Sequence, residues 1–193
     1  MTTIPQNREL LKNLFDLIAN SCEIAGQQRV RERLELLVLA ELFTFGRHTI
    51  TQLLMSLGLT EQDWSAWYRL FSQERFDYEA ASAGLLAESL RYVAPDQVYV
   101  VAGDATQTPR SSRRLEGAWW LRNPRTPPFM VGIHAAQRWF NGSWLMPQEN
   151  GYSRAVPLRW SPAFTDKSQP QTTAPLKEWQ ACVQFLTWLR QQF

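Results

Sequence analysis

Near residue 97 the spacing of apolar residues changes, and this change constrains the fold more than any other feature of the chain. Before it, apolar residues recur every three or four positions, which predicts helices through residues 7–93. After it come "VYVVAG" (98–103) and "PFMVGIHAAQRW" (128–139), β-branched or alternating runs that predict buried strands. We therefore expect an α+β fold, with helices in residues 1–95 and the sheet in residues 96–193.

Turn signals subdivide the second region. The segment "FNGS" (140–143) contains an Asn-Gly pair, the strongest short hairpin signal, so we expect a turn there and a third strand at "WLMP" (144–147). The segment "AWWLRN" (118–123) is compatible with a strand or a loop, and residues 149–173, rich in Pro, Ser and Arg, predict an irregular connection. An amphipathic segment (174–193) then predicts a helix, which gives three antiparallel strands plus one C-terminal helix.

Residues 46–72 have the outline of two helices joined by a tight turn at Gly58, as in a helix-turn-helix. The second of these helices is rich in aromatic residues, whereas a recognition helix presents polar and basic side chains to a DNA groove. Only Arg69 is available for such a role. Two interpretations stay open: core packing, which the composition favours, and direct DNA reading.

The net charge is only +2, but it is unevenly distributed. Residues 1–104 have nine basic and fourteen acidic side chains, whereas residues 105–160 have eight arginines and two glutamates. An excess of arginine suits phosphate contact, because the guanidinium group binds phosphate bidentately and keeps its charge. A solvated surface is the alternative interpretation. The arginines that we expect to bind DNA are Arg110, Arg113, Arg114, Arg122 and Arg125.

One carboxylate, Asp104, directly follows the first predicted strand, with Thr106 and Thr108 beside it. A carboxylate at such a place can bind Mg²⁺, which prefers oxygen ligands, and two such ions can stabilise both oxygens of a phosphoryl transfer. An Asp after an apolar strand is also a common turn former or helix cap. The residues alone leave both interpretations open.

The N-terminus, "MTTIPQNREL", is polar where a signal peptide would be apolar. The longest apolar run, "LELLVLAELF" (34–43), is about half a membrane span and contains Glu35 and Glu41. Cys22 and Cys182 lie in apolar helical segments and predict buried free thiols. We therefore expect a soluble cytoplasmic protein that does not bind a membrane.

The helical region and the predicted strands carry a set of motifs in a fixed order. "RHTITQLLMSLGL" (47–59) and "DWSAWYRLFS" (63–72) precede "VYVVAGDATQTPRSSRRLEGAWW" (98–120), and "PFMVGIHAAQRWFNGSWLMP" (128–147) and "VPLRW" (156–160) follow. Together these segments resemble the N-terminal portion of a bacterial DDE-superfamily insertion-sequence transposase. Such enzymes have an RNase H-like catalytic domain preceded by a helical region.

The resemblance implies roles for several parts of the chain. Asp104 matches the first acid of the catalytic triad, and is thus the implied catalytic residue and Mg²⁺ ligand, with Thr106 as its companion. Gly132 and His134 match the second strand, although a lone histidine in an apolar strand is more often packed in the core. Residues 1–95 would be a helical DNA-binding or dimerisation region, and the rest a partial RNase H-like domain.

The chain departs from the family in its remaining acids. The family's second acid lies on a fourth strand and its third on a later helix. After Asp104 the only acids are Glu116, Glu149, Asp166 and Glu178, and none has that context. We therefore expect an RNase H-like domain truncated after its first catalytic Asp, and a chain that is catalytically silent alone.

The resemblance also implies partners and a reaction. The full enzyme would hydrolyse the phosphodiester at the transposon end and transfer the freed 3′-hydroxyl to target DNA, with Mg²⁺. The expected partners are DNA and either a second copy of the chain or the missing C-terminal half of the transposase. A non-enzymatic regulator derived from a transposase, which binds DNA or protein, is the second hypothesis, and a plain helical scaffold is the third.

Overall fold

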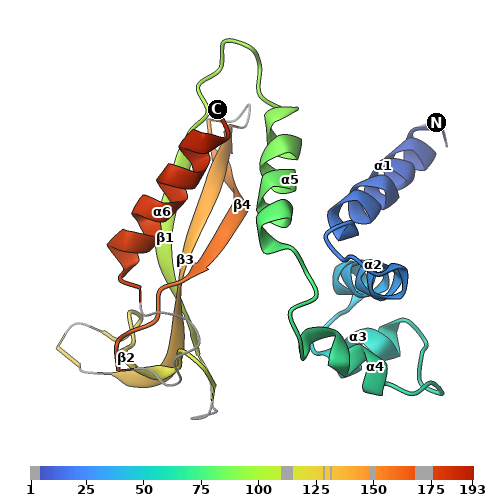
Figure 1. The fold of residues 1–193 in the computed structure, drawn as a ribbon, viewed down its shortest axis with the longest axis horizontal. Helices are drawn as coiled ribbons and strands as arrows, with labels where there is room; N and C mark the ends of the chain where they lie inside the picture. Colours follow the sequence, from blue (N-terminus) through green and yellow to red (C-terminus); the bar gives the residue numbers. More distant parts are fainter. Residues whose placement is uncertain (1–4, 110–114, 128, 131, 148–150, 168–175) are drawn as a thin grey trace. The chain divides into compact units, whose positions relative to one another are not determined.

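The structure is a computed structural model and describes residues 5–109, 115–127, 129–130, 132–147, 151–167 and 176–193. The chain forms two compact units, residues 1–85 and 86–193 (Figure 1). The fold is α+β, as predicted. No helix in the described part of the chain is long and apolar enough to cross a membrane.

The first unit is built from helices. Apolar residues at helical spacing form them, and a short 3₁₀ helix (η1) follows the fourth. The elements are α1 (Pro5–Cys22), α2 (Gln28–Phe43), α3 (Ile50–Ser56), α4 (Ser65–Tyr68), η1 (Arg69–Phe71) and the first part of α5 (Tyr78–Leu90).

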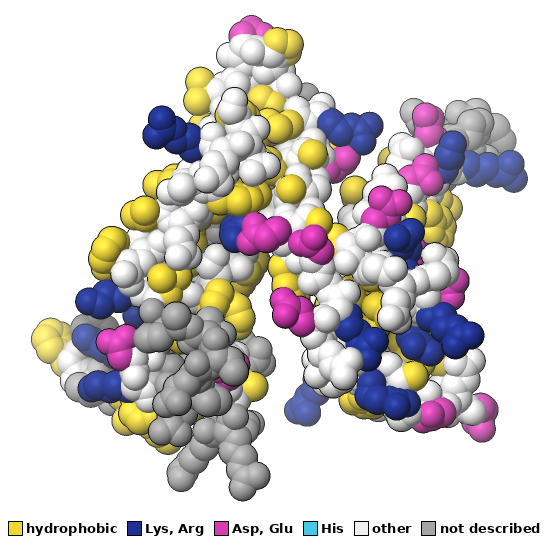
Figure 2. All heavy atoms as spheres, viewed as in Figure 1, with side chains coloured by type: hydrophobic (Ala, Val, Ile, Leu, Met, Phe, Trp, Pro, Cys, Tyr) yellow, Lys and Arg dark blue, Asp and Glu magenta, His cyan; other side chains and the backbone are white. Residues whose placement is uncertain are grey.

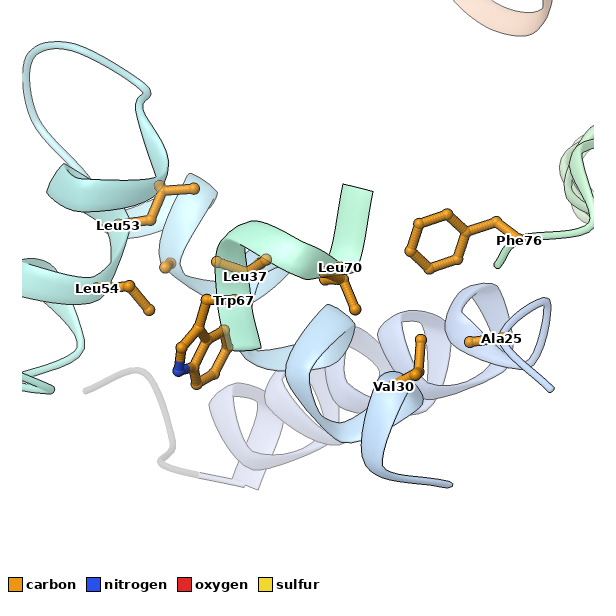
Figure 3. Close-up of a cluster of buried hydrophobic side chains, with 9 residues drawn as sticks. Ala25, Val30, Leu37, Leu53, Leu54, Trp67, Leu70 and Phe76 are labelled. Carbon is orange, nitrogen blue, oxygen red and sulfur yellow. The ribbon is translucent and has the colours of Figure 1, made fainter. Parts of the chain in front are cut away.

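The core of the first unit lies between α2, α3, α4 and η1 (Figure 3). Trp67 and Leu70 are 5% and 2% exposed and pack there with Leu37 and Leu54. The helix predicted for the second half of the helix-turn-helix is thus one α-helical turn followed by η1. Its tryptophans, Trp67 and the partly buried Trp64, pack in this core, whereas Tyr68 and Phe71 are 47% and 55% exposed.

The second unit contains a four-stranded antiparallel sheet with β3 (Ile133–Pro147) at its centre. β1 (Val101–Pro109) pairs with one edge of β3. Asn141 pairs with both Asp104 of β1 and Trp160 of β4 (Ser153–Pro162), so β4 lies on the opposite edge of β3. β2 (Trp119–Arg122) shares that edge with β4, at the other end of β3.

The predicted hairpin at "FNGS" is wrong, because Asn141 and Gly142 lie inside the continuous strand β3. A Cβ atom on Gly142 would lie 2.4 Å from the ring of Phe185. The glycine is therefore needed for close approach of a helix to the strand and not for a turn. The two strands expected on either side of the turn are one strand of 15 residues.

The prediction of an irregular connection over 149–173 is also wrong for residues 153–162, which form β4. Pro157 lies where the register with β3 shifts, and Leu158 is the extra residue of this bulge. Proline is tolerated at bulges and edge strands, since no ladder hydrogen bond from its nitrogen is needed there. The undecided segment at 118–123 contains the short strand β2.

Helix α6 (Glu178–Gln191) lies across one face of the sheet (Figure 1). Phe140, Trp144 and Leu158 of the sheet pack with Phe185 and Trp188 of this helix, and all five are at most 9% exposed. The arrangement of three long antiparallel strands followed by a helix on one face is consistent with a partial RNase H-like fold.

Candidate nucleic-acid interface

Asp104 is the fourth residue of β1 and its side chain is exposed. It was expected at the exit of a buried strand, and this is wrong in two respects. The strand begins only at Val101, after the exposed residues Val98 and Val100, and it continues past the aspartate to Pro109. The acid therefore stands in the middle of a strand at the edge of the sheet, where its backbone is fixed by pairing to β3.

Side-chain alternation places Asp104 on the face of the sheet opposite α6. Phe140 and Gly142 face α6, as their contacts with Phe185 show. Asn141, between them, must point to the other face, and its cross-strand partner Asp104 points the same way. One face of the sheet is thus packed under a helix, and the acid belongs to the other.

On this second face, Asp104, Asn141 and Trp160 form a row across three strands, here called the Asp104 row. Asp104 and Trp160 are exposed, Trp160 to 49%. The backbone N–H of Ala105 donates to Asp104 Oδ1 at 2.8 Å, and Ser143 Oγ donates to Asn141 Oδ1 at 3.2 Å. The row offers a carboxylate, an amide and an aromatic ring to an outside ligand. These groups suit a nucleic acid, because aromatic rings stack on bases and an amide can hydrogen-bond to them.

The described residues do not fit a two-metal site at Asp104. Within the described ranges, no group of three His, Cys, Asp or Glu side chains could hold a metal ion. The cross-strand neighbour of Asp104 supplies a neutral amide instead of a second carboxylate. One carboxylate cannot hold the two ions that stabilise the attacking and leaving oxygens of a phosphoryl transfer.

The other acids of the second unit lie away from Asp104. Glu178 begins α6, on the opposite face, and approaches Arg138 with an N–O distance of 3.9 Å. Glu116 precedes β2, and its carbonyl oxygen accepts a hydrogen bond from Gln137, four residues along β3 from Asn141 and so about 13 Å away. Asp166 lies in an exposed turn after β4, and Glu149 is outside the described residues.

Two of the five predicted DNA-binding arginines can be placed. Arg122 is the last residue of β2 and pairs with Ile133, so alternation puts it on the same face as Asp104. Ile133 and Asn141 are eight positions apart in β3, which is about 26 Å along the strand. Arg125 is exposed in the loop after β2. The remaining three, Arg110, Arg113 and Arg114, lie outside the described residues.

His134 and Gly132, which the resemblance assigns to the second strand, make packing and hydrogen-bond contacts away from Asp104. His134 is half-buried in β3, and its Nε2 lies 2.8 Å from Gln107 Oε1. Alternation directs it to the face opposite the Asp104 row. Gly132 precedes the strand, where a Cβ atom would collide with the Thr126 side chain. Neither residue lies with Asp104, whereas Thr106 shares its face two residues along β1.

Sequence reasoning missed two members of the Asp104 row. Asn141 was interpreted as part of a turn, and Trp160 was placed in an irregular connection. The place of Trp160 in this row, on the far side of Asn141 from the acid, depends on the pairing of β3 with β4. No local signal in the sequence specifies that register, because the register shifts at Gly142 and Ser143.

A comparison with protein families gives one match, to the model described as DDE superfamily endonuclease, over residues 23–192. The match includes most of the helical unit as well as the sheet and α6. No curated protein and no solved structure matches the chain. The match covers most of the chain and both of its compact units, so the protein belongs to the DDE superfamily endonuclease family.

Proposed function

We propose that this chain acts in DNA transposition as a DNA-contacting part of a DDE transposase, and that it does not cleave DNA by itself. In the full enzyme, divalent metal, Mg²⁺ by the resemblance, would support phosphodiester hydrolysis and strand transfer. The family match supports a transposase-like nuclease in general. The observation that carries the finer proposal is the Asp104 row, a single acid with an amide and an exposed tryptophan on the face of the sheet opposite α6.

DNA contact through this face follows from its groups. Trp160 is accessible for stacking on a base. Removal of a stacking ring typically lowers the binding free energy by about 1–3 kcal/mol per base. Arg122 lies on the same face, about 26 Å along β3 from the Asp104 row. Its guanidinium group can bind another phosphate there. Proposed contacts from Arg110, Arg113, Arg114 and Arg125 would add to this surface.

Salt dependence of DNA binding tests the proposed contacts. We would titrate the whole chain into a fluorescein-labelled DNA duplex and follow anisotropy at several NaCl concentrations. Each neutralised phosphate contributes about 0.9 to the slope of log K against log salt, so we expect a slope of several units. Arg122→Gln should lower the slope by about one, whereas Arg190→Gln, an equal loss of charge at the exposed end of α6, should not. A slope near zero for the unchanged chain would refute DNA contact.

The proposed lack of DNA cleavage by this chain is tested separately. With Mg²⁺ and a duplex substrate, we expect no strand cleavage by the unchanged chain, since one carboxylate does not complete a two-metal site. Asp104→Asn is the control for contaminating nucleases. Cleavage that Asp104→Asn removes would show that this chain assembles an active site.

A further inference from the structure

Three arginines of the helical unit line one cavity of about 180 Å³: Arg33 of α2, Arg69 of η1 and Arg75. The rest of its lining is apolar, from Val30, Ala66 and Leu70. The first 104 residues carry more acidic than basic side chains, so this gathering of arginines is opposite in sign to its region. In Figure 2, Lys and Arg side chains (dark blue) gather over α2, α3 and α4 of this unit.

The hydrogen-bond and ring partners of these side chains are uncharged, although Asp63 lies near enough to Arg69 to interact with it electrostatically. Arg33 lies over the ring of Trp67, with 5.9 Å from Cζ to the ring centroid. Arg69 donates to the carbonyl and hydroxyl oxygens of Ser65 at 3.3 and 3.0 Å, and Arg75 donates to Gln73 Oε1 at 2.9 Å. Every one of these partners is uncharged. Among the described residues, none of the three arginines forms an ion pair.

One N–H group of Arg75 lacks a hydrogen-bond acceptor among the described residues. This is the N–H group of the buried Nε atom. A buried guanidinium N–H without an acceptor costs about 1–3 kcal/mol or more, because its water has been removed and not replaced. Arg33 and Arg75 are both half-buried, so their mutual repulsion is less screened than that of exposed charges. An anion in the cavity would supply the opposite charge that these arginines lack among their hydrogen-bond partners.

We propose that this arginine cavity binds a phosphate of the DNA backbone, at a site separate from the Asp104 row. The inference rests on the proposed DNA-binding function and adds a second contact, in the helical unit. Guanidinium groups suit phosphate oxygens because each presents two parallel N–H donors. A second hollow of about 300 Å³ shares Val30 and Arg75 with the first. Gln27 and Gln73 line it and provide neutral donors for the adjoining part of a backbone, whereas Glu74 is acidic.

The test uses the whole chain, a fluorescein-labelled duplex and anisotropy over a NaCl series. Arg75→Gln and Arg69→Gln should each weaken binding about tenfold at low salt and lower the salt slope by about one. Arg8→Gln, which removes an equal charge from exposed α1, should change neither. Glu74→Gln should tighten binding, because it removes a negative charge beside the cavity. Arg69 is exposed, so its replacement keeps the test valid if Arg75→Gln fails to fold.

The outcomes separate this inference from the proposed function. If Arg122→Gln weakens binding but Arg69→Gln and Arg75→Gln do not, the cavity is not a DNA site and the sheet surface stands. The reverse result would support the cavity and remove the sheet surface. Free phosphate is the other source of the same chemistry. The assignment to DNA is overturned by two results together. About 50 mM inorganic phosphate raises the melting temperature of the unchanged chain but not that of Arg75→Gln, and neither Arg69→Gln nor Arg75→Gln alters DNA binding.

Discussion

The two faces of the sheet differ in what covers them, and the difference separates folding from function. On one face Phe140, Trp144 and Leu158 are at most 3% exposed beneath α6. On the opposite face, here called the open face, Asp104 and Trp160 are exposed in a row with Asn141, although Gln137 and Ser143 of that face are buried. Strand β3 contributes to both, since consecutive residues point to opposite faces.

The face to which a strand residue points therefore predicts whether its substitution alters stability or binding. A change on the α6 face should alter stability, because packing there is dense and apolar. A change in the Asp104 row should alter ligand binding and leave stability nearly unchanged.

Phe185→Ala should lower the free energy of unfolding of the sheet unit by about 3–5 kcal/mol, because the ring is 1% exposed and its loss leaves a cavity. Urea denaturation followed by circular dichroism measures it. Trp160→Ala is the matched control, since it removes an aromatic side chain of the open face and should cost less than about 1 kcal/mol. Equal losses for both variants would show that the faces do not differ.

Gly142→Val should destabilise the same unit by about 1–3 kcal/mol, because a Cβ atom would lie 2.4 Å from the Phe185 ring. Asn141→Val, the same side chain introduced one residue earlier, points to the open face and should have a much smaller effect. The pair is compared by thermal unfolding. If Gly142→Val leaves the melting temperature unchanged, the close approach of α6 to β3 is wrong.

Asp104→Asn should tighten DNA binding about fivefold when divalent cations are chelated. The carboxylate repels phosphates that approach this face, by about 1 kcal/mol at 4 Å in water. Anisotropy with EDTA measures the change, and stability should change by less than about 0.5 kcal/mol. Unchanged affinity would mean that phosphates do not approach Asp104.

The ion pair between Arg138 and Glu178 should contribute least to stability, although it lies on the face covered by α6. Their N–O distance is 3.9 Å and the Glu178 side chain is 49% exposed, so water and salt screen the pair. A double-mutant cycle with Arg138→Gln and Glu178→Gln should give a coupling energy below about 0.5 kcal/mol. A coupling above 1 kcal/mol would make the ion pair part of the core of the α6 face.

The sequence was sufficient for the fold class and the family, but it placed Asp104 after the first strand and not within it. Periodicity located α6, because Phe185 and Trp188 recur at helical spacing. The Asn-Gly pair misled the prediction, because the reason for Gly142 is the ring of Phe185, more than forty residues away in the sequence. Local turn statistics contain no information on such a contact.

The composition of the site was less predictable than the fold. Asn141 and Trp160 join Asp104 only through the register of three strands, and β4 begins in a stretch whose prolines and serines resemble a loop. The arginine cavity likewise brings Arg33 of α2 together with Arg69 of η1 and Arg75 of the loop after η1. These groupings are products of tertiary packing, which a single sequence does not specify.

Cross-linking tests the role of the open face most directly. A photoreactive label would be placed at Ala102→Cys, exposed beside Asp104 on β1, or at Val183→Cys, exposed on α6, in a chain with Cys182→Ser. Cys22 is buried, and burial raises the pKa of its thiol to about 11, so it should stay unlabelled. The separation of the faces predicts that a bound duplex cross-links to position 102 and not to position 183. Cross-linking from position 183 alone would contradict it.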